Sequence, residues 1–394
     1  MPSRRVARTL PPIALAALIA ARCAQPTAPG PFYRAPSGHG AGRPGHVIRS
    51  EPLAGAPPGS RAWKILYVST GFDGKPVEVS GVIVAPTLPP PAGGRPVVAW
   101  AHPTTGVSDR CAPSNWPTFF DTIPHLPALV ALDCVVAATD YEGLGTPGPH
   151  PYLVGRSEAL SVLDSVRAAR EIEKAAAGTR FVVWGHSQGG HAALFTGQLA
   201  RDYAPDLTLM GVAAIAPATE LATLLRADLV ERAGRILGAY CLWSWSRVYG
   251  APIDRIVETS SVAVIDRVAA DCLESDEEGY VAAFDSLTLR SDFVESGAYE
   301  AEPWKSLMEE NRPGRSPIGA PIYIAQGTDD PIVRPAVTAD FVQGLCGRGE
   351  AVRFEKLEGV GHTKAARVSA SSAIGWMADR FEGRRAPNTC SRDW

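Results

Sequence analysis

The stretch that decides the fold runs from Phe181 to Leu194 and reads Phe-Val-Val-Trp-Gly-His-Ser-Gln-Gly-Gly-His-Ala-Ala-Leu. An apolar run typical of a strand leads into Gly185-His-Ser-Gln-Gly189, and a pattern typical of a helix follows. Gly-x-Ser-x-Gly between a strand and a helix predicts a sharp, strained turn that exposes a serine hydroxyl. Glycines flank the serine because a Cβ there would collide with the neighbouring strand or helix. We therefore predict that Ser187 is a nucleophile.

A serine hydroxyl needs a base to take its proton and an acid to orient that base. In α/β-hydrolases the acid and then the histidine follow the serine along the chain. His191 lies in the helix that adjoins the turn, on the wrong side of it. The other histidine beyond Ser187 is His362, which lies between the strand-like residues 351–357 and the helical residues 365–381. We predict that His362 is the base.

The acid is expected in the loop that follows the buried-strand pattern at residues 321–327. Two aspartates, Asp329 and Asp330, compete there. The spacing Gly-x-x-Asp-x-x-Val, counted from Gly327, favours Asp330, and Asp329 remains the alternative. The interval from the serine to either aspartate is too long for one strand-helix unit, which predicts an insertion between them.

A tetrahedral oxyanion needs two hydrogen-bond donors. The backbone N–H of Gln188, directly after the nucleophile, is expected to be the first. The second is expected from the loop after the strand-like residues 95–101, which reads His102-Pro-Thr-Thr-Gly106. Because Pro103 has no N–H, this donor is Thr104 or Thr105.

Strand and helix patterns alternate along much of the chain, which predicts a mainly parallel sheet with helices on both faces. Two strands before it, joined across Gly71–Lys75, are expected to form an antiparallel hairpin. The predicted strands are 64–70, 77–85, 96–101, 134–139, 180–184 and 208–216, and the predicted helices are 157–176 and 188–202. The core of this α/β-hydrolase fold is assigned to residues 61–217 and 316–394.

Residues 218–315 break the alternation and are assigned to a helical cap. Helix-like stretches lie at 221–238, 259–272 and 277–287. The cap also carries an apolar cluster: Tyr240, Leu242, Trp243 and Trp245. Packing of these side chains against the core is the commoner outcome, and lining of an acyl-chain pocket is the alternative.

The charge and motif content exclude several classes of protein. A formal net charge of −3 and a sequence pI near 6.3 give no reason to expect a nucleic-acid partner. We find no CxxC pair, phosphate-binding loop, dinucleotide fingerprint or HExxH motif. The sequence therefore implies no metal and no organic cofactor.

The N-terminus has the pattern of a secretory signal. Residues 1–8 are basic, and the apolar run from Ile13 to Ala21 is too short to span a bilayer as a permanent helix. We predict a signal peptide over residues 1–21, a Pro- and Gly-rich flexible leader over 22–60, and a secreted or extracytoplasmic protein. A lipid anchor at Cys23 is the alternative, although Arg22 stands where such a signal has a small residue.

Several motifs, in their order and spacing, resemble the bacterial branch of the secretory lipase (lipase A-like) family. They are His102-Pro-Thr-Thr-Gly106, Asp109-Arg-Cys-Ala-Pro-Ser114, Asp140-Tyr-Glu-Gly-Leu-Gly145, His150-Pro-Tyr152 and Gly185-His-Ser-Gln-Gly189. The resemblance covers about residues 60 to 390. It implies an α/β-hydrolase fold with a helical cap inserted before the acid, and hydrolysis of acylglycerols and simple esters.

The resemblance also implies roles for individual residues. Ser187, Asp330 and His362 map onto the family's catalytic triad, and Gln188 with Thr104 or Thr105 maps onto its oxyanion hole. Pro103 departs from the glycine that hydrolases often place after this histidine. Asp140 and Tyr141 map near the family's substrate funnel, where they would bind substrate without taking part in the chemistry.

Export makes disulfides expected, and six cysteines remain beyond Cys23. Six cysteines allow 15 pairings, among which the sequence alone does not choose. The resemblance implies Cys111–Cys272 and Cys346–Cys390. Cys134–Cys241 is then the remaining combination, and buried free thiols are the alternative.

Together these observations predict a secreted serine hydrolase of carboxylic esters that acts through an acyl-enzyme on Ser187. The expected partner is a small-molecule or lipid ester, with transient contact to a lipid interface and no obligate protein partner. The alternatives are an acyltransferase, another serine hydrolase such as a carbohydrate esterase, a peptidase or a polyester hydrolase, and a non-catalytic binding protein on the same fold.

Overall fold

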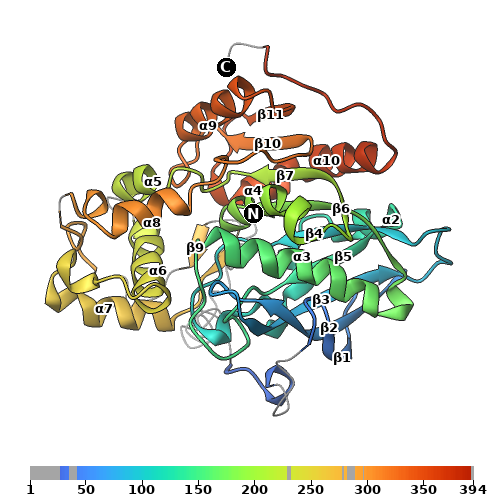
Figure 1. Cartoon of the computed structure of the whole chain (residues 1–394), viewed down its shortest axis with the longest axis horizontal. Helices are drawn as coiled ribbons and strands as arrows, with labels where there is room; N and C mark the ends of the chain where they lie inside the picture. The colour runs from blue at the N-terminus through green and yellow to red at the C-terminus, as the bar shows by residue number, and fades with distance from the viewer. Residues whose placement is uncertain are drawn as a thin grey trace, which may run out of the picture.

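The computed structural model describes residues 27–34, 42–228, 232–276, 279–281, 289–295 and 297–391. Its centre is a nine-stranded sheet with the order β1-β2-β3-β5-β4-β6-β7-β10-β11 (Figure 1). The strands are β1 Val47–Leu53, β2 Ser60–Thr70, β3 Pro76–Pro86, β4 Arg95–Ala101, β5 Val135–Thr139, β6 Ala177–His186, β7 Thr208–Ile215, β10 Ile322–Gly327 and β11 Val352–Leu357. The strands from β5 to β11 in this order pair in parallel, and β1, β2 and β3 form an antiparallel edge that joins at β5.

The central strands are apolar on both sides because both faces of the sheet are covered. In β4, Val98 and Trp100 belong to one hydrophobic cluster, whereas the intervening Val97 and Ala99 belong to the other. Alternate residues of a strand point to opposite faces, so a strand buried on both faces needs an unbroken apolar run. This pattern is what made the strands visible in the sequence.

Helices cover the two faces unequally. The helices α3 Gly155–Glu171, α4 Gln188–Tyr203 and α9 Pro335–Gly347 pack on one face, and α2 Leu126–Ala131 and α10 His362–Phe381 pack on the other. The predicted helix 157–176 ends earlier, since Ile172 turns to an extended conformation after α3. His362 was expected in a loop and instead begins α10.

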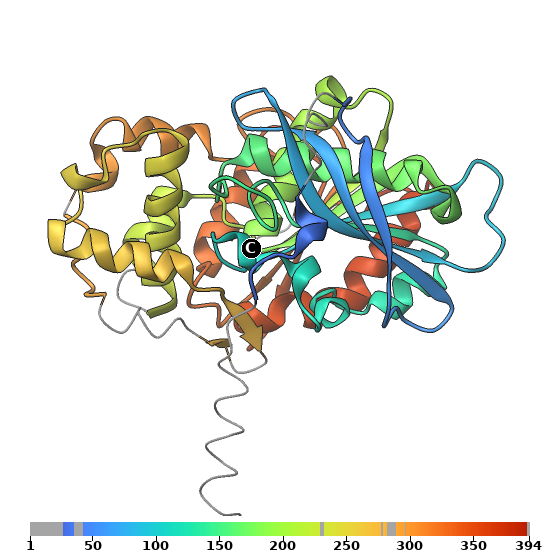
Figure 2. The same ribbon diagram turned by 90° about the horizontal axis from the view of Figure 1, so that it is seen from below.

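The long segment between β7 and β10 is largely helical. It contains α5 Leu221–Asp228, α6 Arg232–Val248, α7 Thr259–Ala270 and α8 Trp304–Glu310. These helices lie together at one end of the molecule, beside the sheet (Figures 1 and 2). The predicted helix 221–238 is divided between α5 and α6. The predicted helix 277–287 is wrong at Gly279–Val281, where β9 pairs with β8 Glu274–Asp276, and its other residues lie outside the described ones.

The aromatic cluster of this segment is mostly packing. Tyr240, Leu242 and Trp245 are fully buried in the same hydrophobic cluster as Trp100 and the other residues on that face of the sheet. Trp243 is half-buried against this cluster, with the Arg247 guanidinium 4.2 Å from its ring centroid. Tertiary packing thus accounts for most of the cluster.

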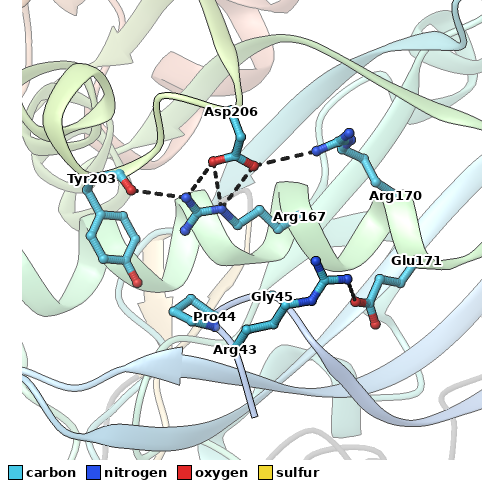
Figure 3. A pocket seen from close by; sticks show the side chains of 8 residues that line it. All are labelled: Arg43, Pro44, Gly45, Arg167, Arg170, Glu171, Tyr203 and Asp206. Atoms are coloured by element: carbon cyan, nitrogen blue, oxygen red, sulfur yellow. Dashed lines mark hydrogen bonds and ion pairs between the residues drawn. The ribbon is translucent and has the colours of Figure 1, made fainter.

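The prediction of a flexible leader that reaches residue 60 is wrong for its second half. Val47–Leu53 forms β1, which pairs antiparallel with β2. Arg43 donates a 2.7 Å hydrogen bond to Glu171 at the end of α3, which also accepts one from the Val47 N–H, beside a surface pocket (Figure 3). The strand escaped detection because β1 lies at the sheet edge, where polar and charged side chains are tolerated. The predicted signal peptide and Cys23 lie outside the described residues.

Both disulfides implied by the resemblance are present, Cys111–Cys272 and Cys346–Cys390. The third pairing is wrong: Cys134 and Cys241 are buried free thiols. Burial raises the pKa of the Cys134 thiol to about 12, so it stays protonated at ordinary pH.

Candidate active site

Ser187 stands at the tip of the turn between β6 and α4. Its backbone has φ 57° and ψ −116°, a conformation that residues other than glycine rarely adopt. A Cβ on Gly185 would lie 2.0 Å from the carbonyl oxygen of Gly189, and a Cβ on Gly189 would lie 1.9 Å from that of Ala101. Both glycines are therefore required by close backbone approach, and together they hold the serine in its strained position.

Three side chains that are far apart in the sequence meet at this turn. His362 Nε2 lies 2.9 Å from Ser187 Oγ, and His362 Nδ1 lies 2.7 Å from Asp330 Oδ2. A carboxylate oxygen only accepts, so the Nδ1–H of His362 donates to Asp330 and the lone pair of Nε2 accepts the hydrogen bond of the serine hydroxyl. The geometry is that of a nucleophile, a base and an orienting acid.

The loop after β10 holds Asp330 in its ionised form. Its Oδ1 accepts hydrogen bonds from the N–H groups of Ile332 and Val333 at 2.9 and 2.8 Å, and Gln326 Nε2 donates to Oδ2 at 2.9 Å. Burial alone would raise the pKa of Asp330, but the His362 imidazole and these backbone donors outweigh it, so the pKa lies below its ordinary value. Asp329, the alternative acid, is exposed.

A second histidine lies against the base. His186 Nε2 donates to the carbonyl oxygen of His362 at 3.0 Å, and the two ring centroids are 4.9 Å apart. Burial, helped by the neighbouring His362 imidazole, lowers the pKa of His186 to about 3. His186 therefore stays neutral at ordinary pH and positions the backbone of the base.

The two predicted sources of oxyanion donors are neighbours. Gln188 is the first residue of α4, so its N–H has no acceptor within the helix. The first turn of α4 packs against the end of β4, because a Cβ on Gly189 would touch the carbonyl oxygens of both Ala101 and His102. This packing brings the end of β4 and His102, from which the loop of Thr104 and Thr105 continues, next to the first turn of α4. Thr104 Oγ1 is hydrogen-bonded to Tyr152 Oη at 2.9 Å.

The loop that carries Thr104 and Thr105 is bonded to the segment that follows α7. The Leu273 N–H donates to the carbonyl oxygen of Thr105 at 2.8 Å, and the neighbouring Cys272 is bonded to Cys111. Gly106 has φ 130°, and a Cβ there would lie 2.6 Å from the sulfur of Cys111. The disulfide and this hydrogen bond thus fix the path of the loop from two sides.

Asp140 and Tyr141, which were expected to bind substrate, are not among the residues that line the cavity beside this loop. Both are buried, and they support the loop from behind: Tyr141 Oη donates to the carbonyl oxygen of His102 at 3.1 Å. The carboxylate of Asp140 accepts from the Ser114 N–H at 2.9 Å and from Ser80 Oγ at 2.6 Å. Burial raises the pKa of Asp140 despite these donors. Sequence patterns place a residue after a strand but do not show which side of the loop it faces.

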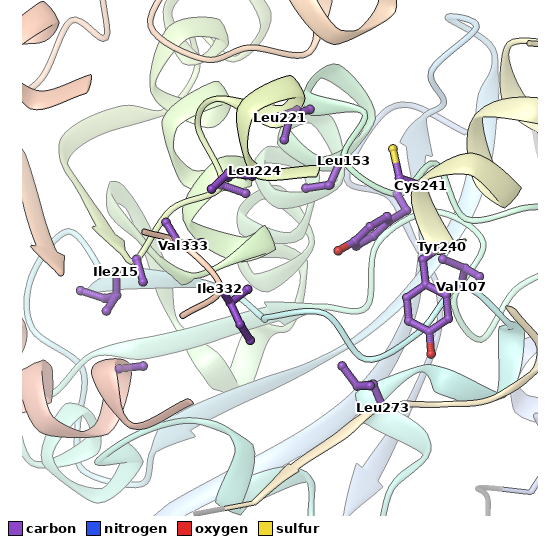
Figure 4. Close-up of a cluster of buried hydrophobic side chains, with 14 of the residues drawn as sticks. Val107, Leu153, Ile215, Leu221, Leu224, Tyr240, Cys241, Leu273, Ile332 and Val333 are labelled. Carbon is purple, nitrogen blue, oxygen red and sulfur yellow. The ribbon is translucent and has the colours of Figure 1, made fainter. Parts of the chain in front are cut away.

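A cavity of about 520 Å³ adjoins the site. One wall is the loop from His102 to Thr105, and others include Trp100, Trp116, His186, Leu273, Thr363 and Lys364. Buried apolar side chains gather around the same region where the sheet meets the helical segment (Figure 4). These include Leu153, Leu221, Leu224, Tyr240, Ile332 and Val333, of which the last two follow Asp330.

A group of buried polar residues behind the nucleophile was not predicted from the sequence. Glu158 on α3 accepts a 2.9 Å hydrogen bond from Gln188 Nε2 and lies 2.7 Å from His191 Nδ1. One signal was available: Glu158 heads a stripe of small and apolar residues at helical spacing, Ser161, Val162, Ser165 and Val166. A carboxylate on a buried stripe needs partners, and here they belong to the nucleophile helix.

Neither a metal cluster nor a spanning helix is found in the described part of the chain. No group of three or more histidine, cysteine, aspartate or glutamate side chains there is arranged to hold a metal ion. Within the same residues, no helix combines the length and apolarity needed to cross a bilayer.

Comparison with known proteins places this site in a family context. Residues 121–389 match the secretory lipase family. A secreted triacylglycerol lipase of Malassezia globosa is 25% identical over 393 residues, which cover 91% of this chain and 80% of that protein. The trichothecene C-3 esterase of Fusarium sporotrichioides is 24% identical over 393 residues, which cover 92% and 86%.

The fold is also shared with a solved structure. The X-ray structure of Candida antarctica lipase A superposes with a TM-score of 0.75 at 17% identity, covering 92% of this chain and 87% of that one. This likeness confirms the predicted α/β-hydrolase fold.

Proposed function

The chain belongs to the secretory lipase family, and from this premise we propose that it hydrolyses carboxylic esters through an acyl-enzyme on Ser187. The observation that carries the proposal is the continuous hydrogen-bonded series from Ser187 Oγ through His362 to Asp330. Relatives named as a triacylglycerol lipase and as an esterase support ester hydrolysis as the reaction type.

In the proposed reaction His362 Nε2 takes the proton of Ser187 as Oγ attacks the ester carbonyl carbon. The imidazolium is stabilised by the ionised Asp330. Negative charge develops on the carbonyl oxygen, where the N–H groups of Gln188 and of Thr104 or Thr105 would donate. One such donor typically contributes about 3 kcal/mol of barrier reduction.

Collapse of the tetrahedral intermediate breaks the bond to the alcohol, which leaves with the proton from His362. Water then loses a proton to His362 as it attacks the acyl-enzyme, and Ser187 recovers its proton as the acid leaves. The cycle consumes one water per ester and needs no cofactor.

We assign the bound ester to the space between the sheet and the helical segment. The cavity bounded by Trp100, Thr104, Trp116 and Leu273 is of the size that holds a small organic group. The buried apolar side chains where the sheet meets the helical segment, such as Leu221, Ile332 and Val333, favour an acyl or alcohol part of low polarity. Transient contact with a lipid interface, inferred from the triacylglycerol lipase relative, remains part of the proposal.

An extracellular location fits the secreted relative and the two disulfides. We further propose that residues 1–21 are a signal peptide and that residues 218–315 act as a cap over the site. The lipid anchor at Cys23 is the competing form of export.

The test is the rate of hydrolysis against acyl length, from acetyl to oleoyl esters, below and above substrate solubility. Wild-type protein should hydrolyse esters and be labelled by a fluorophosphonate at Ser187, whereas Ser187→Ala should lose both properties and keep its circular dichroism spectrum. A rise on crossing saturation would mark a lipase, and its absence an esterase of dissolved substrates. Full activity in Ser187→Ala would overturn the proposal.

The same assay separates the other chemistries. Transfer of the acyl group to an added alcohol in preference to water would identify an acyltransferase. Cleavage of peptides or acetylated sugars in preference to simple esters would identify another serine hydrolase. A protein that is neither labelled nor active would be a binding protein on this fold.

A further inference from the structure

The side chain of Gln188 is held in place by two buried hydrogen bonds. Its Nε2 donates both hydrogens, one to Glu158 Oε1 at 2.9 Å and one to His150 Nε2 at 3.0 Å. Gln188 is 1% exposed and directly follows the nucleophile. Because side chain and backbone N–H belong to one residue at the start of α4, these two bonds limit how that N–H can turn.

Both acceptors are fixed by their own partners. His150 accepts through Nε2, so its proton is on Nδ1, which donates to the carbonyl oxygen of Glu142 at 2.8 Å. Glu158 Oε1 accepts a second hydrogen bond from the Leu153 N–H at 3.1 Å. Neither acceptor can move without breaking a further buried hydrogen bond.

The other oxygen of Glu158 meets His191, one turn along α4 from Gln188. Both side chains are fully buried, and Glu158 Oε2 lies 2.7 Å from His191 Nδ1. His191 Nε2 lies 2.8 Å from the carbonyl oxygen of Asn311, which only accepts, so Nε2 carries a proton. The contact at Nδ1 then needs one more proton, shared between imidazole and carboxylate.

Asn311 follows α8 and belongs to the helical segment. Its Oδ1 accepts from the N–H of Gly155, the first residue of α3, at 3.0 Å, and its Nδ2 donates to Tyr249 Oη after α6 at 3.0 Å. The group therefore joins the nucleophile helix, the helix that carries Glu158, and the helical segment in one buried network. Removal of one member of such a network weakens the positions of the others.

We propose that Glu158, together with His191, is a positioning residue for ester hydrolysis: it holds Gln188 so that the N–H after the nucleophile faces the oxyanion. The inference rests on the proposed function. It concerns the rate of the chemical step, since neither side chain lines the cavity in which the substrate is placed. The hydrogen-bonding pattern, more than the charge, is what positions Gln188.

Glu158→Gln should preserve that pattern. The amide oxygen can accept from Leu153 and Gln188, the amide nitrogen can donate to a neutral His191 at Nδ1, and Nε2 of His191 still donates to Asn311. Glu158→Ala removes the carboxylate and with it the hydrogen bonds to Gln188 Nε2 and His191 Nδ1. We expect Glu158→Ala to lower kcat about 10- to 100-fold with KM within about twofold, less than the effect of deleting an oxyanion donor. Glu158→Gln should keep kcat within about threefold.

Asp164 supplies the matched control. It is a fully buried carboxylate on the same helix, bonded to Ser69, Arg167 and Tyr203, and none of these partners lies at the nucleophile. Asp164→Asn should lower stability without changing kcat or the rate of labelling of Ser187 by a fluorophosphonate.

Gln188→Met breaks the same contact from the other side and serves if Glu158→Ala does not fold. It should reproduce the fall in kcat with unchanged KM. Wild-type kcat in either Glu158→Ala or Gln188→Met would overturn the inference, as would a Glu158→Gln variant as slow as Glu158→Ala. In these cases an active wild type leaves the proposed function standing, whereas an inactive and unlabelled wild type overturns both.

Discussion

The N–H of Leu273 donates a hydrogen bond of 2.8 Å to the carbonyl oxygen of Thr105. Leu273 directly follows Cys272, which forms a disulfide with Cys111. A segment that follows α7 is thereby fastened to the loop that would supply the second oxyanion donor. The covalent link and the hydrogen bond act on the same few residues. This arrangement predicts that the two disulfides of the described residues differ in their effect on activity.

Cys111→Ser with Cys272→Ser should lower stability and activity together. Loss of a native disulfide typically costs about 2–5 kcal/mol, and displacement of the loop should lower kcat about 10-fold or more. Cys346→Ser with Cys390→Ser is the control, because that bridge ties α9 to the C-terminal segment. It should lower the free energy of unfolding while kcat is unchanged. Equal losses of kcat in the two double variants would contradict this prediction.

Asp330→Asn should lower kcat by about four orders of magnitude, because an amide cannot hold His362 in the correct tautomer. The backbone N–H groups of Ile332 and Val333 can still donate to the amide oxygen at the Oδ1 position, so the fold should persist. Asp329→Asn should stay within about twofold of wild type, since that side chain is exposed. Steady-state kinetics on a soluble ester checks both variants, and a reversed order would make Asp329 the acid.

Gly189→Ala should abolish folding. Its Cβ would lie 1.9 Å from the carbonyl oxygen of Ala101, and backbone at the centre of the sheet cannot give way. Gly375→Ala is the opposite case: Gly375 lies within α10, is exposed, and a Cβ there meets nothing within 4 Å. It should raise the free energy of unfolding by about 0.5–1 kcal/mol. Thermal unfolding and soluble yield would report both results, and a soluble, active Gly189→Ala protein would refute the first.

His150 should make stability depend on pH. Burial lowers its pKa from 6.5 to about 4, so between these values the unfolded chain binds a proton that the folded chain does not. The contribution of His150 to the free energy of unfolding is complete above about pH 6.5. It decreases by about 1.4 kcal/mol per pH unit as the pH falls towards 4.

Urea denaturation of wild type and His150→Asn between pH 4 and 7 isolates this contribution. Other buried groups, such as His102, His186 and Asp140, are common to both proteins and cancel in the comparison. The wild-type curve should fall more steeply with decreasing pH. Parallel curves would show that His150 is not held neutral in the folded state.

Much of the fold could be predicted because central strands need apolar residues on both sides. The runs at β4, β6 and β10 leave little choice, and each ends in a loop that carries a polar residue of the site. The spacing from Gly327 chose between Asp329 and Asp330 because this short loop must return N–H groups to its own carboxylate.

The rest depended on tertiary contacts that no local pattern records. Edge strand β1 tolerates charged residues, so its sequence resembles a loop. Cys134 and Cys241 are both buried, but burial does not reveal whether two sulfurs are neighbours. Glu158 lies on a buried stripe of α3, but its partners Gln188 and His191 belong to α4 and cannot be identified from the neighbours of Glu158 in the sequence. Asp140 is buried against Ser80 and Ser114, which are likewise remote in the sequence.

The pairing of β7 with β10 has a practical consequence. Everything between Ala216 and Pro321 is one excursion between adjacent parallel strands, so the strand-to-strand bonding does not depend on the length or composition of that excursion. It is attached to the sheet part of the molecule by the Cys111–Cys272 disulfide, by the contacts of Leu273 and Asn311, and by hydrogen bonds of Ser244 and Trp245 to the segment from His150 to Tyr152. A chimaera that exchanges the excursion for another while keeping these junctions should retain the scaffold and acquire a new choice of ester.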